Sequence, residues 1–340
     1  MKQKNQMLWP WVLAAAVTSV ASVASMTSVS GAVIAAGAVQ NFPTKPVRII
    51  VGYAPGGGVD MAARLVGQAV GELWNGSVVI DNRPGAAGSI GTEMTARAAP
   101  DGYTMMLCNI ATHGITPART PKLPYDPIRD FSFLSRVGGT PNVLMAHASL
   151  PARNIQELVA HAKAHPGKLS YGSSGVGSSP HLSVELLKLM AGISIVHVPY
   201  KGAAPALADV MGGQIPLSVG NLPGGPLAAI KSGKVRGLAV TTLKRSSKAP
   251  DVPTMAESGV PGYEVNGWYG ICSPKLPRAL EAKINADLVK ALATNTLKQR
   301  LDDQGIDVQS STPEELVAHV RAEIAKWSKV VKEAKLDSSE

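Results

Sequence analysis

Two short glycine-rich turns, each between an apolar strand and an amphipathic helix, constrain this chain more than any other feature. The first turn, Tyr53–Gly58, follows the apolar run Val47–Val51. The second, Gly172–Ser179, follows Lys168–Tyr171 and precedes a helix that we expect to open at Pro180. The start of a helix presents unpaired backbone N–H groups and a partial positive charge, so such a turn can hold a carboxylate or phosphate without a basic side chain. Two such turns predict an anion held from two sides.

Short apolar runs alternate with helical patterns along the chain, which is typical of βαβ units and largely parallel sheets. A further glycine-rich loop, Asn82–Gly91, follows the strand Val78–Ile80, and a third strand is expected at Thr104–Cys108. The run Pro121–Pro127 is too rich in proline for regular structure and marks a long connection.

Capping residues mark three helix starts. Asn154, with Glu157 three residues later, has the spacing of a capping box, and Thr312 before Pro313 is expected to cap the last helix. Ser179, directly before Pro180, is expected to cap the helix after the second turn, which leaves Ser178 as the better candidate for a ligand contact.

The first 38 residues are predicted to be a secretory signal peptide rather than part of the fold. Lys2 and Lys4 precede an apolar, small-residue run from Met7 to Ala38 without Asp or Glu, and Ala36–Ala38 fits a cleavage site. The alternative is a retained membrane anchor, for which the interrupting Ser and Thr residues make the run poorly suited.

Composition limits the classes of function. The 340 residues are 45% hydrophobic and 17% charged, which indicates a globular chain long enough for two domains. Three Phe and seven Tyr offer few stacking surfaces, and the positive charge (+9, or +7 without the first 38 residues) is scattered. Nucleic acid is therefore not an expected partner, although a diffuse positive field favours encounter with anions.

Neither glycine turn fits a catalytic or nucleotide-binding motif. Gly172–Gly175 lacks the G-x-S-x-G spacing of a nucleophile elbow, and Pro180 stands where a dinucleotide fingerprint needs its last glycine. The sequence offers no recognisable set of nucleophile, base and orienting group, so we expect neither an enzyme nor a cofactor.

The metal-ligating residue types give no recognisable site either. His161 and His165 lie four apart on an expected helix, but no third ligand is suitably spaced, so a solvated face is expected and no metal. Cys108 and Cys272 lie in strand-like runs, where buried free thiols are the default, and whether they form a bridge stays open.

From Phe42 onward the chain carries a series of short motifs in a fixed order. They are Phe42–Val47, Pro55–Gly57 with Asp60, Asn82–Gly85, Pro100–Thr104, Leu123–Pro127, Ala162–Leu169, Gly177–Ser178 with His181–Leu182, His197–Gly202 with Pro205–Ala206, Gly212–Gln214, Asp251–Thr254 and Pro261–Glu264. Together they resemble the solute receptors of tripartite tricarboxylate transporters, the Bug receptors, which are periplasmic binding proteins.

The resemblance implies a two-lobe α/β periplasmic-binding-protein fold, type II-like, with two hinge strands and a ligand cleft that closes by hinge motion. Lobe 1 would comprise residues 39–142 and 266–340, and lobe 2 residues 143–265. Val143–His147 is expected to leave the first lobe and Trp268–Cys272 to return to it. The resemblance also implies that carboxylates are held by backbone N–H groups and small hydroxyls, partly through water.

These two lines of inference give a set of expected ligand-binding residues. They are Tyr53, Pro55, Gly56, Gly57, Gly58, Asp60, Asn109, Ala111 and Thr112 in lobe 1, and Ser173, Ser174, Gly175, Gly177, Ser178, His181 and Tyr200 in lobe 2. Asp60 has the alternative role of a helix cap, His181 that of a structural hydrogen bond, and Tyr200 that of a pocket wall.

Two departures from the family pattern bear on the ligand. Family members often carry acidic residues where this chain has Pro216 and Gly220. Their absence argues against an amino-acid ligand and favours a plain mono- or dicarboxylate.

The expected function is that of a monomeric periplasmic receptor, cleaved from its signal peptide, which binds a small carboxylate and delivers it to the membrane components of a tripartite transporter. A ligand sensor that passes its occupancy to a membrane signalling protein is one alternative, and an exported α/β enzyme is another.

Overall fold

Three apolar runs form the parallel part of the first sheet, sheet A. In the computed structural model, which describes residues 39–120, 122–222 and 224–334, these are β1 (Val47–Val51), β2 (Val78–Asn82) and β3 (Thr104–Asn109), in the order β2-β1-β3. The predicted signal peptide lies outside the described residues. β1 and β3 are almost fully buried, as expected for strands covered by helices on both faces.

One long strand belongs to both sheets of the molecule. β4 (Phe131–Ala146) pairs antiparallel with β9 (Asn266–Pro274) over residues 131–141, and then with sheet B over residues 142–146. The expected strand Val143–His147 is only its last part. The earlier part was missed because two register shifts and buried serines interrupt the apolar pattern.

Sheet B repeats the parallel arrangement. β7 (Leu217–Asn221), β5 (Ser170–Ser173) and β6 (Val196–Pro199) follow β4 in that order, and β8 (Arg236–Val240) also pairs with β4. In sheet A, β3 pairs antiparallel with β9, and the short β10 (Asp307–Val308) pairs with β4. The sheets are thus parallel at their outer strands and antiparallel at the crossing strands β4 and β9.

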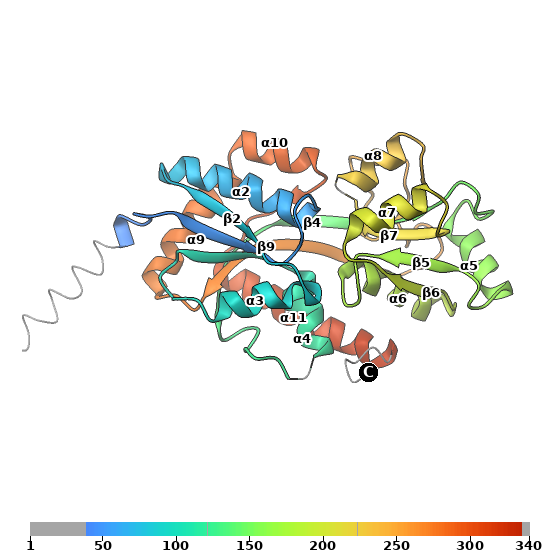
Figure 1. Cartoon of the computed structure of the whole chain (residues 1–340), viewed down its shortest axis with the longest axis horizontal. Helices are drawn as coiled ribbons and strands as arrows, with labels where there is room; N and C mark the ends of the chain where they lie inside the picture. The colour runs from blue at the N-terminus through green and yellow to red at the C-terminus, as the bar shows by residue number, and fades with distance from the viewer. Residues whose placement is uncertain (1–38, 121, 223, 335–340) are drawn as a thin grey trace, which may run out of the picture. The chain divides into compact units, whose positions relative to one another are not determined.

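Helices cover both faces of each sheet (Figure 1). On sheet A, α2, α9 and α10 pack together on one face, and α3, α4 and α11 lie on the other; on sheet B, α7 and α8 lie opposite α6. The helices are α2 (Gly58–Trp74), η1 (Ala86–Gly88), α3 (Ser89–Ala96), η2 (Ala111–Ile115), α4 (Thr116–Arg119), α5 (Ile155–Ala164), α6 (Ser179–Ala191), α7 (Ala203–Met211), α8 (Gly225–Lys231), α9 (Arg278–Leu292), α10 (Asn295–Asp303) and α11 (Pro313–Ala334). Within the described ranges, no helix combines the length and the apolar character needed to cross a membrane.

Two of the three predicted helix caps are confirmed. The Asn154 side chain accepts from the N–H of Glu157 at 2.8 Å, and Thr312 Oγ1 accepts from the N–H of Glu315 at 3.2 Å. The third prediction, Ser179, is wrong because α6 begins one residue earlier and Ser178 is its cap.

Candidate functional site

The first glycine turn leaves the N-terminus of α2 open. Gly57 is the N-cap in an extended conformation, and Gly56 has a φ of +87° that favours glycine. Both are exposed, and a Cβ on either would meet no atom within 4 Å. The first N–H groups of a helix have no partner within it, and the space beside Gly56 and Gly57 is open.

The side chain of Asp60 holds this turn in place through hydrogen bonds. Its carboxylate, 3% exposed, accepts hydrogen bonds from the N–H of Gly56, from Arg64 and from the amide of Asn82, at 2.9–3.0 Å. Burial of the carboxylate opposes its ionisation, but these hydrogen bonds outweigh that effect and lower the pKa of Asp60. Its oxygens are occupied within the chain, which is the capping role named as the alternative.

A buried tyrosine lies directly beside the start of α2. The hydroxyl of Tyr269 on β9 would be 3.1 Å from a Cβ on Gly58, and the residue is 2% exposed. This hydroxyl has no hydrogen-bond partner among the described residues, and burial raises its pKa. An unsatisfied buried hydroxyl costs about 1–3 kcal/mol, so a hydrogen-bond partner at this position would stabilise the protein.

The end of β3 forms a self-contained turn. The side chain of Asn109 accepts from the N–H groups of Ala111 and Thr112 at 2.9 and 3.0 Å, and the Tyr53 hydroxyl lies 3.5 Å from the same oxygen. These four predicted residues therefore lie together. The two N–H groups are satisfied by the Asn109 side chain and are not free donors for a ligand.

The loop Gly85–Gly88 is strained. All four of its residues have positive φ, including Ala86 at +47° and Ala87 at +53°. For alanine this conformation costs about 1–3 kcal/mol, and such strain gathers at functional sites. The carbonyl of Ala87 accepts from the Tyr53 hydroxyl at 3.0 Å, which joins this loop to the first glycine turn.

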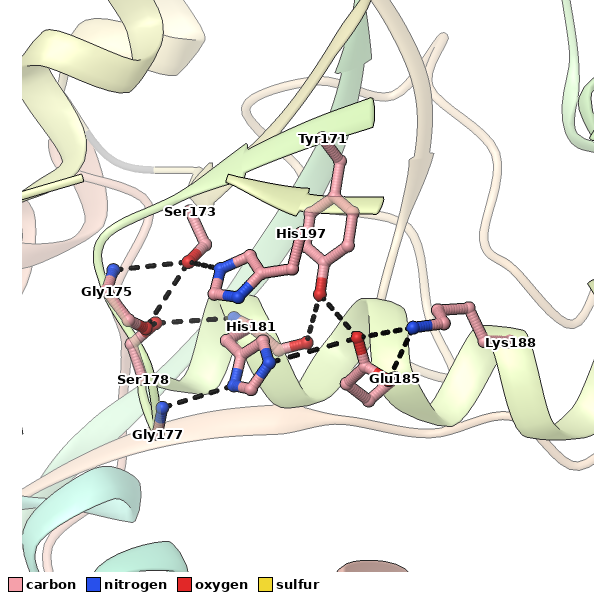
Figure 2. Close-up of polar contacts among 9 residues, drawn as sticks. All are labelled: Tyr171, Ser173, Gly175, Gly177, Ser178, His181, Glu185, Lys188 and His197. Carbon is pink, nitrogen blue, oxygen red and sulfur yellow. Dashed lines mark hydrogen bonds and ion pairs between the residues drawn. The ribbon is translucent and has the colours of Figure 1, made fainter. Parts of the chain in front are cut away.

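The second glycine turn is closed by its own hydroxyls (Figure 2). Ser173 Oγ accepts from the N–H of Gly175 at 3.1 Å and lies 2.7 Å from His197 Nε2. Ser178 Oγ donates to the carbonyl of Gly175 at 2.7 Å and accepts from the N–H of His181 at 3.3 Å. The expected ligand contact at Ser178 is thus occupied by helix capping.

One hydroxyl of the second turn is not used in this way. Ser174 is half-buried, and its side chain makes no hydrogen bond with any residue that the structure describes. Of the serines expected to contact a ligand, Ser174 alone has its hydroxyl available.

A buried polar network supports the second turn from below, as Figure 2 shows. His181 Nδ1 accepts from the N–H of Gly177 at 3.1 Å, and its ring stacks on His197 with centroids 4.0 Å apart. Glu185 completes the network, because its carboxylate accepts from Tyr171 at 2.7 Å and pairs with Lys188 at 2.8 Å. His181 therefore has the structural hydrogen bond considered in the sequence.

This network predicts that the fold loses stability in acid. Burial, with the nearby charges of His197, Arg119 and Lys188, lowers the pKa of His181 from 6.5 to about 3. The unfolded chain therefore binds more protons between these values, and the free energy of unfolding falls as the pH falls, by up to about 1.4 kcal/mol per unit from this residue.

Urea unfolding at pH 7, 6 and 5 measures this slope. His181→Gln, which keeps an acceptor for Gly177, should flatten the slope by about that amount, and His161→Gln, at a half-buried position of α5 outside this network, is the control. Equal slopes in all three proteins would contradict the role given to His181.

Two predicted residues remain: Pro55, which is exposed in the first glycine turn, and Tyr200, whose side chain points away from the second one. The Tyr200 hydroxyl donates to Asp209 on α7 at 2.6 Å, while its backbone N–H donates to Ser173. Its ring edge would be 3.0 Å from a Cβ on Gly172. The ring of Tyr200 thus packs against Gly172 at the start of the second turn.

The second turn lies close to α4 and η1, through residues that were not predicted. A Cβ on Gly177 would overlap the guanidinium of Arg119 on α4 and would lie 3.9 Å from the Cβ of Ala87. The guanidinium of Arg119 thus lies against the second turn, which was expected to hold an anion without a basic side chain.

Three residues at the site were missed by the sequence reasoning: Tyr269, Ala87 and Arg119. Tyr269 lies on an expected crossing strand, and Ala87 lies in a glycine-rich loop that was noticed without a role. No sequence motif pointed to Arg119. It ends the short helix α4 and comes near Gly177 only through the folding of the chain. Two surface cavities lie elsewhere. One, of about 470 Å³, is lined by residues between 117 and 120 and between 123 and 130, and the other, of about 760 Å³, by residues between 126 and 131, Lys275 and α11. Neither is lined by a predicted site residue.

Two sheets with crossing strands β4 and β9, and glycine turns at the strand ends, define the two-lobe α/β fold of periplasmic binding proteins. The sequence pattern of the family described as "Tripartite tricarboxylate transporter family receptor" matches residues 62–336. The chain belongs to this family of solute-binding receptors.

Relatives and solved structures agree with this assignment. Protein BugT of Bordetella pertussis is 34% identical over 296 residues, covering 86% of this chain and 90% of BugT. The structure described as R. palustris Rpa4515 with adipate has a TM-score of 0.82 at 37% identity, covering 86% of this chain and 98% of that one. MatC from Rhodopseudomonas palustris with bound malate has a TM-score of 0.79 at 32% identity, covering 85% and 100%.

Proposed function

We propose that this receptor binds a small mono- or dicarboxylate between its two lobes and delivers it to the membrane components of a tripartite transporter. The proposal includes export to the periplasm, cleavage of residues 1–38 and action as a monomer without catalysis. Relatives solved with adipate and malate support the class of ligand.

The observation that carries the proposal is the unpartnered hydroxyl of Tyr269 beside the open N-terminus of α2. A carboxylate there would accept from this hydroxyl and from the first N–H groups of the helix. Donors fixed in advance lose little on binding, so together they replace the water that the anion gives up.

The lobe boundaries are proposed at residues 142 and 266. Lobe 1 then comprises residues 39–142 and 266–340, and lobe 2 residues 143–265. β4 changes its pairing partner from β9 to β7 between Pro141 and Asn142, and β9 begins at Asn266, which supports these boundaries. Bending at these two strands would move Gly177 relative to Ala87, and so open or close the site.

A thermal-shift screen of carboxylic acids tests the proposal. A ligand that binds only the folded state must raise the melting temperature, by an amount equivalent to about 2.7 kcal/mol at a hundred times its Kd. Adipate, malate and succinate are the first probes, and adipamide, which keeps the carbon chain of adipate without charge, is the matched control. The proposal fails if no carboxylate raises the melting temperature, or if adipamide does so as well as adipate.

A further inference from the structure

Three soft donor side chains from separate segments meet in the core of sheet A. They are Cys108 on β3, His113 in η2 and Cys272 on β9, all fully buried, with ligand atoms within 4.8 Å of one another. The antiparallel register sets Met106 opposite Cys272 and Cys108 opposite Gly270. Because residues two apart share a face, both thiols point to the same side of the sheet.

The imidazole of His113 is oriented for ligation through Nε2. Its Nδ1 lies 2.9 Å from the hydroxyl of Thr112, and that hydroxyl lies 3.2 Å from the carbonyl of Asn109, to which it donates. With the proton on Nδ1, this arrangement leaves the Nε2 lone pair toward Cys272 Sγ, 3.9 Å away. A metal-bound histidine typically donates its other ring N–H in this manner.

The surroundings hold this ring in place. The rings of Phe131 and Phe133 pack against it edge-on, with centroids 4.8 and 5.4 Å away. A neutral, fixed imidazole is the form that binds a metal ion.

Charge and size favour one class of ion. Two thiolates and a divalent cation sum to zero, so the complex carries no net charge into an apolar core, whereas a monovalent ion would leave a negative charge there. Metal–ligand lengths of about 2.3 Å to sulfur and 2.0–2.1 Å to nitrogen place two donors of one ion about 3.5–4 Å apart. The three donors, whose ligand atoms lie within 4.8 Å of one another, therefore need to approach by about 1 Å.

We propose that Cys108, His113 and Cys272 form a buried site for one soft divalent ion, of which Zn²⁺ is the type. Binding replaces the two thiol protons with the ion and releases them to solvent. Hard ions such as Mg²⁺ and Ca²⁺ are excluded by the donors, because they prefer carboxylate and carbonyl oxygens. Thr112 and Asn109, which orient the imidazole, are also among the expected ligand-binding residues at the end of β3. An ion bound here would therefore restrict the motion of that part of the candidate site.

Zinc retention by the mature chain tests the site directly. The protein is unfolded with a chelator, refolded with equimolar ZnCl₂ and a phosphine reductant, passed over a desalting column with dilute chelator, and assayed for metal by mass spectrometry. Reduction prevents a disulfide from competing, and refolding gives the ion access to a fully buried site. We expect one Zn²⁺ per chain.

Variants separate this site from surface binding. Cys108→Ser/Cys272→Ser should retain at least about tenfold less zinc. His161→Ala/His165→Ala removes the histidine pair of α5 and its C-cap, whose ring centroids are 4.7 Å apart, and should retain as much as the native chain. Refolding with Co²⁺ gives a second readout, because sulfur ligation produces a thiolate-to-cobalt charge-transfer band in the native chain even if the cysteine variant does not fold.

Three results would overturn the proposal. The reduced native chain binds no zinc, the cysteine variant retains as much as the native chain, or the cobalt form lacks the charge-transfer band. None of these results bears on carboxylate binding, which is measured separately.

Discussion

Gly57→Val is expected to weaken carboxylate binding at least about tenfold, equivalent to about 1.4 kcal/mol or more, with the fold intact. Gly57 has a φ of −85° and a ψ of 169°, which valine adopts readily, and its Cβ would enter open space. The branched side chain would fill the volume in front of the first N–H groups of α2. Isothermal titration with the acid that gives the largest thermal shift measures the loss.

Gly76→Val is the matched control for this prediction. Gly76 lies just past the other end of α2, is exposed, and would bring a new Cβ no closer than 3.7 Å to any neighbour. It should bind as the native chain does. If Gly57→Val also binds normally, the first glycine turn has no part in the site.

Tyr269→Phe is expected to weaken carboxylate binding about tenfold and, without ligand, to stabilise the fold by about 1 kcal/mol. The two effects have opposite directions because the hydroxyl is buried without a partner until a ligand arrives. Removing it relieves that cost in the free protein and removes a donor from the complex. Urea unfolding and titration measure the two effects.

Tyr263→Phe provides the contrast. The Tyr263 hydroxyl is equally buried but donates to the carbonyl of Ser183 at 2.7 Å. Its loss should destabilise the fold by about 1–3 kcal/mol and leave binding unchanged. If Tyr269→Phe destabilises the free protein in the same way, its hydroxyl has a structural partner and the proposed role is wrong.

Secondary structure and helix caps that depend on neighbouring residues could be predicted from the sequence. Val47–Val51 is a short apolar run that predicts a buried strand, and Leu316, Val320 and Trp327 recur at helical spacing along α11 and are buried. The caps Asn154 and Thr312 depend on residues three apart, so they too are visible in one stretch of chain.

Features that depend on contacts between residues distant in sequence could not be predicted from the sequence. Ser178 and Ser179 are equally good caps, and the choice is made by Asn142 on β4, whose amide donates to Ser179 Oγ at 2.8 Å. β4 itself was underestimated, because its buried Thr140 and Asn142 look like loop residues until their partners are known.

The candidate site divides in the same manner. The glycine turns were found because positive φ and a helix start leave a local signature, at Gly56, Gly175 and Gly177. Tyr269 and Arg119 belong to the site only through packing, so no spacing reveals them. The proximity of Cys108 and Cys272 likewise has no local signal, because the two residues meet through the pairing of β3 with β9.

The most direct test of the central claim is a crystal structure of the receptor with the carboxylate that most raises its melting temperature. The account predicts one carboxylate within hydrogen-bond distance of the Tyr269 hydroxyl and of the N–H of Gly58 or Val59. A ligand that leaves the Tyr269 hydroxyl unpartnered, or that occupies the surface cavity at residues 117–130, would contradict it.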